Sequence, residues 1–176
     1  ANLIFTMKVS IIIPSFNNLD YLKLILQSIK INSKYEHEII VHVNEGIDGT
    51  LDFIKNNDIK HSLSSKNIGL CSAVNKAAAL STTDYIMYSH DDMFFCKNWD
   101  VILEKKIKDQ TNNLFYLSGK AISDNDINDS LKCGLTYDAF NKDSFQEFCN
   151  NNNTPDLQGS HWAPHLIHKD IWNRVG

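Results

Sequence analysis

Two adjacent carboxylates, Asp91 and Asp92, follow directly on the mostly apolar segment 85–89, Tyr-Ile-Met-Tyr-Ser. Like charges side by side resist joint burial, so both stay ionised only where water or a cation neutralises them. Carboxylate oxygens are hard ligands that suit Mg²⁺ or Mn²⁺, and such ions keep positions open for substrate phosphates. The pair is therefore a candidate divalent-cation site facing a diphosphate. The alternative is a polar turn or a cap for a helix that begins near Asn98.

The segments that must position this pair alternate between strand and helix patterns. Residues 8–13, Lys-Val-Ser-Ile-Ile-Ile, have the continuous apolar character of a strand buried on both faces, and Pro14 closes them. Further strands are predicted at 38–43, more weakly at 59–63, and at 85–89. Helices are predicted from a cap at Asn17 or Asn18 to about Ile31, from 49 to 56, and from 69 to 80.

This alternation predicts an α/β fold in which right-handed crossovers place helices on both faces of a mostly parallel sheet. Ligands bind such sheets beyond the carboxyl ends of the strands. Ser15, Asn44 and Asp91 each follow or end a predicted strand, so we expect them to meet at one edge of the sheet. A fold that placed them on opposite faces would contradict the prediction.

The rest of the chain carries weaker signals. A helix is predicted at 99–109 and a strand at 114–117. Beyond Ser118 the sequence is rich in Asn, Asp and Ser and passes through an asparagine run at 150–153, which favours surface loops or a mobile segment. Residues 7–117 are therefore expected to form the ligand-binding core, and residues 118–176 a loop-rich region of the same domain.

Composition narrows the class of protein. The 176 residues, 43% of them hydrophobic, suffice for one domain, and the net charge of −4 offers no basic footprint for a nucleic acid. Four widely spaced cysteines indicate neither a zinc site nor a disulfide framework, which favours a reducing, cytoplasmic setting. No apolar run approaches the length of a membrane-spanning helix. Residues 1–6 share an Asn-Leu-x-Phe core with a common protease-tag site and are left out of the fold argument.

Five motifs in order carry a resemblance to a known family. They are Val9-Ser-Ile-Ile-Ile-Pro-Ser-Phe-Asn17, Glu38-Ile-Ile-Val41, Asp48-Gly-Thr50, Asn67-Ile-Gly-Leu-Cys-Ser-Ala-Val-Asn75 and Asp84-Tyr-Ile-Met-Tyr-Ser-His-Asp-Asp92. Across residues 8–109 the chain resembles the family 2 glycosyltransferases of the GT-A fold. The resemblance implies a nucleotide-sugar-binding, Rossmann-like domain that uses Mn²⁺ or Mg²⁺.

The resemblance assigns roles to the turn after the first strand. It places Pro14, Ser15, Phe16 and Asn17 beside the nucleotide, with Phe16 packed on the base or ribose. The alternative for Phe16 is a core aromatic at the end of a strand.

The acidic pair resembles the Asp-x-Asp motif of the family. Asp92 fits the metal ligand, and Asp91 fits a metal or sugar contact. His90 stands where the family has its first aspartate, and it can ligate a metal or point aside. Asn44 stands where the family commonly has an acidic pair facing the base; its amide could still read a pyrimidine edge, so the nucleotide is left open.

Three further residues are candidates for the phosphate side of the site. Gly69 permits an unusual backbone angle where a helix begins, and a helix N-terminus favours a phosphate. Lys66 could contact a phosphate, although a solvated surface charge is the more common role. Asn67, together with Asn75, is better explained as a structural cap.

The end of the chain carries a second cluster of aromatic and polar residues. The stretch 156–165 suits a sugar or acceptor pocket, in which Trp162 would stack on a sugar and His161 would complete a metal site or touch the diphosphate. A core tryptophan and a structural histidine are the alternative. Residues 166–176 resemble the family's helix before a Gly-Gly-Phe-like turn, so the chain is expected to be truncated at its C-terminus.

The resemblance implies an inverting transfer of a sugar from a nucleotide-diphosphate donor to an acceptor hydroxyl, in glycan or polysaccharide synthesis. The acceptor would be a glycan, a lipid-linked molecule or a protein, at the cytoplasmic side of a membrane or in the cytoplasm. The catalytic base is expected beyond Gly176, with Asp156 and His161 as weak candidates within the chain. The 176-residue chain should therefore bind nucleotide but transfer sugar poorly. A nucleotidyltransferase is disfavoured because Pro-Ser-Phe-Asn replaces its glycine-rich basic loop; a non-catalytic binding module stays open.

Overall fold

The computed structural model describes residues 7–120, 133–134, 136–151 and 163–175. The strands of these residues are β1 (Val9–Phe16), β2 (Glu38–Asn44), β3 (Lys60–Ser64), β4 (Tyr85–Tyr88), β5 (Tyr116–Ser118) and β6 (His165–His168). The helices are α1 (Leu19–Asn32), α2 (Thr50–Asn56), α3 (Leu70–Ala78), α4 (Trp99–Lys108), α5 (Lys142–Asn151) and α6 (Lys169–Val175).

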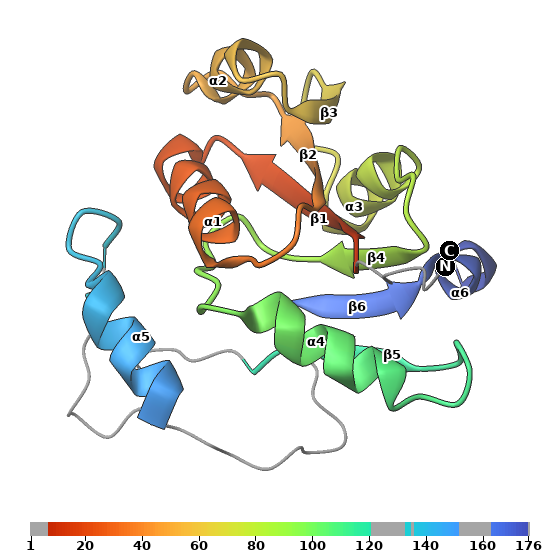
Figure 1. Cartoon of the computed structure of the whole chain (residues 1–176). Helices are drawn as coiled ribbons and strands as arrows, with labels where there is room; N and C mark the ends of the chain where they lie inside the picture. The colour runs from red at the N-terminus through yellow and green to blue at the C-terminus, as the bar shows by residue number, and fades with distance from the viewer. Residues whose placement is uncertain (1–6, 121–132, 135, 152–162, 176) are drawn as a thin grey trace.

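The six strands form one sheet in the order β3-β2-β1-β4-β6-β5 (Figure 1). β1 pairs in parallel with β2 and β4, and β2 pairs in parallel with β3. β6 lies antiparallel between β4 and β5. The predicted mostly parallel α/β sheet is therefore confirmed.

Helices cover both faces of the sheet because alternate residues of a buried strand point to opposite sides. On one face, Ile11 and Ile13 of β1 belong to a core that includes residues of α1, α2 and α4. On the other face, Ile12 belongs to a smaller core with Ala77 of α3, and Trp172 of α6 packs against it. The continuous Ile-Ile-Ile run of β1 is thus buried on both sides, as its pattern predicts.

The first strand continues past the proline that was expected to end it. Ile12 accepts a hydrogen bond from Ser89 N at 3.0 Å, the last backbone bond between β1 and the β4 side, whereas pairing with β2 runs on to Phe16. Alternate residues of a strand direct their backbone groups to the same side, so the ring nitrogen of Pro14 faces the unpaired side. A proline there removes no ladder bond.

The cap expected for α1 is also different. Asn18 occupies the N-cap position without a side-chain hydrogen bond to the helix. Instead Asp48, from the loop after β2, accepts hydrogen bonds from Leu19 N at 2.9 Å and from Thr50 N at 3.1 Å. One carboxylate therefore caps the first turns of both α1 and α2, a long-range contact that local sequence spacing does not reveal.

Two segments near the end of the chain correct the sequence reading. The region after Ser118 was expected to form surface loops, yet it contains α5, where Gln146 accepts a hydrogen bond from Lys97 N at 2.8 Å and Phe145 packs edge to face on Phe94 at 5.5 Å. Residues 166–176 were expected to be helical, but His165–His168 is a strand, and the helix begins only at Lys169. Residues 165–168 are extended because they pair with β4 and β5 on either side. Four residues are too few to show a helical or strand periodicity in the sequence.

A buried carboxylate fastens α4 to the turn between α1 and β2. Asp100 is 0% exposed and accepts hydrogen bonds from Lys34 N and Tyr35 N, both at 2.8 Å, and from His37 Nε2 at 3.1 Å. Val9 N donates to the other ring nitrogen of His37 at 3.4 Å, which places the imidazole proton on Nε2. Burial lowers the pKa of His37 against the opposing influence of Asp100, consistent with a neutral ring.

Glu38 joins β1, β3 and the loop before β4 at the amino ends of the strands, opposite to the carboxyl ends of β1 and β2. Its carboxylate accepts hydrogen bonds from Ser10 Oγ, from Lys60 Nζ at 2.8 Å, and from Thr82 N and Oγ1, each at 2.9 Å. Burial alone raises the pKa of Glu38, but the hydrogen bonds from Lys60, Ser10 and Thr82 outweigh it and lower the pKa to about 2.

We expect Glu38→Gln to lower the free energy of unfolding at pH 7 by about 1–3 kcal/mol, because it removes the charge from several hydrogen bonds. A depressed folded-state pKa stabilises the fold above the ordinary glutamate pKa of 4.5 and loses that contribution as pH falls toward about 2. The difference between the two proteins in urea unfolding should therefore shrink as pH is lowered below 4.5. Glu36→Gln, at an exposed position, serves as the control and should change little at any pH. A constant difference between pH 7 and pH 3 would contradict the prediction.

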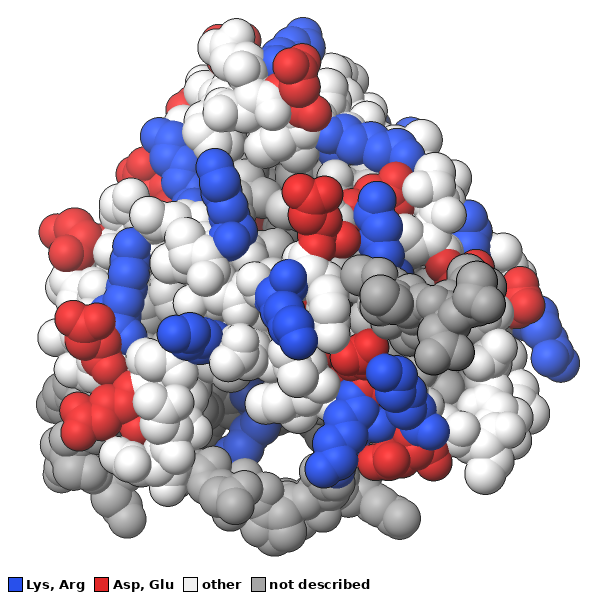
Figure 2. Space-filling view, viewed as in Figure 1, with Lys and Arg blue, Asp and Glu red and all other residues white. Residues whose placement is uncertain are grey.

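On the face in Figure 2, lysine and acidic side chains are interspersed and no broad basic field is visible. Among the described residues, no helix has the length and apolar character needed to cross a bilayer.

Candidate functional site

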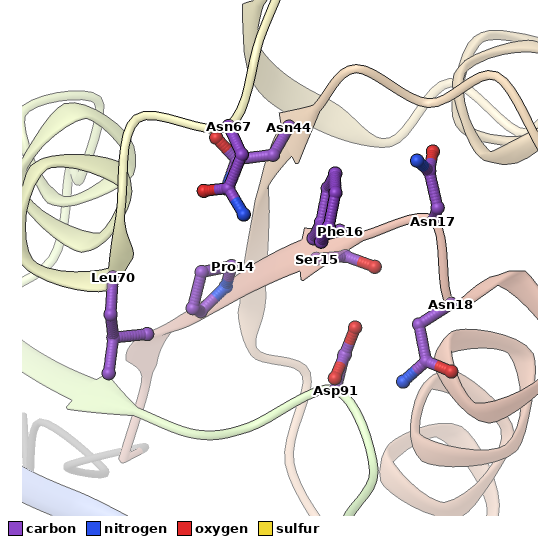
Figure 3. A pocket seen from close by; sticks show the side chains of 9 residues that line it. All are labelled: Pro14, Ser15, Phe16, Asn17, Asn18, Asn44, Asn67, Leu70 and Asp91. Carbon is purple, nitrogen blue, oxygen red and sulfur yellow. The ribbon is translucent and has the colours of Figure 1, made fainter.

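Two adjoining hollows open at the carboxyl ends of β1 and β2 and the start of the loop after β4. The first, about 280 Å³, is lined by Pro14, Ser15, Phe16, Asn17, Asn18, Asn44, Asn67, Leu70 and Asp91 (Figure 3). The second, about 150 Å³, is lined by Pro14, Leu70, Tyr88, His90, Asp91 and Asp92. Ser15, Asn44 and Asp91 thus meet at one place, as the sequence predicts.

The end of β1 supplies the floor of the first hollow. Phe16 is 46% exposed although it ends a buried strand, so it is not a core aromatic, and its ring lies among the residues that line the hollow (Figure 3). Asn17 has φ +47° and turns the chain away from the sheet. Its side chain accepts from Ile47 N at 3.0 Å and donates to Glu45 at 3.3 Å, which holds the loop after β2 beside Phe16.

Asn44 closes the far side of the first hollow. It is 4% exposed, and its Oδ1 accepts hydrogen bonds from Ser64 Oγ at 2.9 Å and Ile68 N at 3.1 Å. The oxygen of this amide therefore fastens the end of β2 to the segment before α3. By these two hydrogen bonds Asn44 holds one wall of the hollow in place.

The turn before α3 depends on a glycine. Gly69 has φ +80° and ψ 163°, a region that is essentially restricted to glycine, and its N–H donates to Asn67 Oδ1 at 2.9 Å. Asn67 lines the first hollow, whereas Gly69 and Lys66 line neither hollow. Asn75 lies further along α3 at an exposed position and lines neither.

Asp91 lies where the two hollows meet. Its carboxylate reaches toward Ser15 and Asn18 (Figure 3). Burial raises the pKa of Asp91, and the charge of Asp92 adds to the rise, against the Ser15 hydroxyl and the Asn18 amide. The Ser15 hydroxyl is near enough to act on Asp91 but is not in hydrogen-bond geometry with any described residue. A cation or a donor from a ligand would therefore stabilise the ionised form of Asp91.

The neighbouring side chains are more open. Asp92 is 57% exposed and His90 is 43% exposed in their side chains, and His90 Nδ1 lies 3.9 Å from Asp92 Oδ1. Within the part of the chain that the structure describes, no three His, Cys, Asp or Glu side chains are grouped as a metal cage. Mg²⁺ and Mn²⁺ nevertheless fit one or two carboxylates when waters and phosphates supply the other ligands, and Asp91 with Asp92 offers that donor set.

Three lining residues have no counterpart among the sequence candidates: Asn18, Leu70 and Tyr88. Tyr88 is the most unusual, because its hydroxyl is buried and has no hydrogen-bond partner among the described residues. Burial, together with the charges of Asp92, Cys71 and Asp91, raises the pKa of Tyr88 to about 12. The sequence carries no signal for Tyr88 beyond its place near the end of the strand before the acidic pair. The candidates Asp156, His161 and Trp162 lie outside the described residues.

The sequence model of the family described as Glycosyl transferase family 2 matches residues 10–172. The chain belongs to this family. The match begins in β1 and runs through β6 into α6, well beyond the motifs that end at Asp92. The acidic pair of this family 2 chain thus lies within a continuous match, at the end of its central sheet.

One solved structure supports the fold, and a second is similar over a smaller part of the chain. The crystal structure of S. aureus TarS 1-349 in complex with UDP has a TM-score of 0.59 at 19% identity, covering 71% of this chain and 39% of that one. The mannosyltransferase PcManGT from Pyrobaculum calidifontis, in complex with GDP-Man and Mn²⁺, has a TM-score of 0.45 at 20% identity, covering 52% of this chain and 29% of that one. The family 2 chain thus spans well under half of each. No curated protein sequence matches it significantly.

Proposed function

We propose that this chain binds a nucleoside diphosphate sugar together with Mn²⁺ or Mg²⁺ and transfers the sugar to an acceptor hydroxyl with inversion. The observation that carries the proposal is the position of Asp91, shared by two adjoining hollows, beside the exposed carboxylate of Asp92. One hollow would hold the nucleoside, the other would hold the sugar, and the diphosphate would cross the acidic pair between them. Membership of family 2 supports the reaction class.

The first hollow suits a nucleoside because it combines an exposed ring with amides. Phe16 offers one face to a base or ribose, and Asn44, Asn67 and Asn17 contribute amide groups to the lining. Because the Oδ1 atom of Asn44 already accepts two hydrogen bonds from the protein, any reading of a base edge by Asn44 would fall to its N–H groups. Such donors favour acceptor-bearing edges of the base.

The acidic pair suits the diphosphate only when a cation is present, since two carboxylates and two phosphates would otherwise repel. Asp91 and Asp92 would hold the cation, and His90 beside Asp92 is a further candidate ligand. When bound, the cation would offset the negative charge that gathers on the departing diphosphate. Asp91 and Asp92 would orient the diphosphate, while Pro14 would exclude water from one side of it.

The inverting course is part of the proposal because the resemblance to the family implies it, and no described residue is proposed as the base that takes the acceptor proton. A glycan, a lipid-linked molecule or a protein would supply the acceptor hydroxyl.

The proposed location is the cytoplasm or the cytoplasmic face of a membrane. All four cysteines are free, which is consistent with a reducing compartment.

Calorimetry tests the proposal directly. UDP and GDP would each be titrated into the protein with and without Mn²⁺, and at least one should bind in Mn²⁺ and bind much more weakly when EDTA is present. Turnover of a bound nucleotide sugar would then separate a transferase from a binding module. Failure of both nucleotides to bind in Mn²⁺ would overturn the proposal.

The exposed ring of Phe16 leads to a separate prediction. We expect Phe16→Ala to weaken nucleotide binding by roughly fivefold or more, because stacking of a base on an aromatic ring is worth about 1–3 kcal/mol. The melting temperature should change little, since the ring is already 46% exposed. Ile47→Ala removes an 83% exposed side chain from the neighbouring loop and should leave affinity unchanged. Equal affinity of wild type and Phe16→Ala, measured by calorimetry, would count against the stacking role.

A further inference from the structure

The buried hydroxyl of Tyr88 is the feature of the second hollow that the fold does not explain. Its Oη is closed to bulk solvent and has no partner among the described residues, although most buried polar atoms in proteins are paired. The ring is held in place by its neighbours: it lies 5.4 Å from the ring of His90 and 5.9 Å from the ring of His165, between centroids. A fixed ring therefore presents an unpaired hydroxyl at one place.

The surroundings of this hydroxyl indicate which kind of group would pair with it. The second hollow has an acidic end at Asp91 and Asp92 and an apolar side at Pro14 and Leu70. Leu70 is 53% exposed, so packing does not prevent its side chain from turning outward when a ligand enters. A ligand that fits must place an anionic, cation-binding group at one end and a neutral hydrogen-bonding group beside Tyr88. A nucleotide sugar has both, as a diphosphate joined to a ring that carries hydroxyls.

We propose that Tyr88 is a specificity-determining residue whose buried hydroxyl hydrogen-bonds to one hydroxyl or ring substituent of the donor sugar in the second hollow. The proposal rests on the proposed function, because it requires the diphosphate at the acidic pair. It adds a residue that recognises the sugar rather than the nucleotide. A site that leaves a buried group unpaired discriminates strongly against a sugar that lacks the matching substituent.

The direct test compares Tyr88→Phe with the wild type in calorimetric titrations of UDP, GDP, UDP-N-acetylglucosamine and GDP-mannose, all in Mn²⁺. Affinity for whichever nucleoside diphosphate binds should stay within about twofold. Affinity for the corresponding nucleotide sugar should fall by about fivefold to tenfold, the usual worth of one hydrogen bond. Tyr116→Phe is the matched control, because it removes a tyrosine hydroxyl from a half-exposed ring of β5 that lines neither hollow.

Stability without ligand provides a second readout. Removing a hydroxyl that has no partner should leave the melting temperature of Tyr88→Phe equal to or above that of the wild type. A clear decrease would show that the hydroxyl is paired within the protein and would overturn the proposal. Equal loss of affinity for UDP and UDP-N-acetylglucosamine, or no loss for either, would also overturn it while leaving the proposed function intact. If none of the four probes binds to the wild type, the proposed function fails and this inference fails with it.

Discussion

Replacing Asp92 with asparagine is expected to lower nucleoside diphosphate affinity in Mn²⁺ by at least about tenfold, or roughly 1.4 kcal/mol. The substitution keeps the shape of the side chain but removes the charge that would offset the cation. Because the side chain of Asp92 is 57% exposed, the fold should tolerate the change, and the loss should appear in binding rather than in stability. Titration of the folded variant by calorimetry, with and without EDTA, measures the effect.

The design separates a cation ligand from a general effect of charge. Asp52→Asn removes one negative charge from an exposed position in the first turn of α2, away from both hollows, and should leave affinity unchanged. In EDTA, Asp92→Asn should bind nucleotide as well as the wild type or better, because a carboxylate without a cation repels the diphosphate. Wild-type affinity of Asp92→Asn in Mn²⁺ would refute the metal role.

Replacing Asp100 with alanine should have the largest effect on stability. The variant would leave Lys34 N, Tyr35 N and the Nε2 proton of His37 without their common acceptor, inside a cluster where the carboxylate is 0% exposed. Each unsatisfied buried donor costs about 1–3 kcal/mol, so the free energy of unfolding should fall by at least about 3 kcal/mol. Urea unfolding followed by circular dichroism measures the loss.

A second variant keeps this prediction testable if the alanine protein does not fold. Asp100→Asn retains one oxygen acceptor and should lose less than the alanine variant. Asp109→Ala, at the exposed end of the same helix, should change stability by no more than about 0.5 kcal/mol. A loss below 1 kcal/mol for Asp100→Ala would show that the backbone donors find other partners.

The sheet core was predictable because its signals are local. The runs at 8–13, 38–43 and 85–89 are rich in β-branched or aromatic residues and alternate with helical patterns, and the structure has a strand at each. The ends of elements were less predictable, because long-range contacts set them. Pro14 stays within β1 only because β4 has ended beside it, and α1 is capped by Asp48 from a distant loop.

The candidate site shows the same division. Ser15, Asn44 and Asp91 were expected to converge from the order of the strands, and they line one hollow. Their detailed settings were not available from the sequence: the Oδ1 of Asn44 is occupied by Ser64 and Ile68, which requires knowledge of where β3 lies. Tyr88 was missed for a related reason, since a tyrosine on a strand is usually explained by packing, and only the structure shows that its hydroxyl lacks a described partner.

The antiparallel strand β6 has a consequence for how the chain acquires its fold during synthesis. β4 leaves the ribosome with β1 on one side, but its other neighbour, β6, comes roughly 80 residues later, which takes on the order of 4–16 s at usual elongation rates. β5 is made earlier than β6, yet it joins the sheet only through β6. During that interval the backbone N–H and C=O groups of β4 that later pair with β6 are unpaired, and strands of other chains can pair with them. Slow translation or crowding at that stage should therefore favour aggregation, and a chaperone that covers β4 would raise the yield of folded protein.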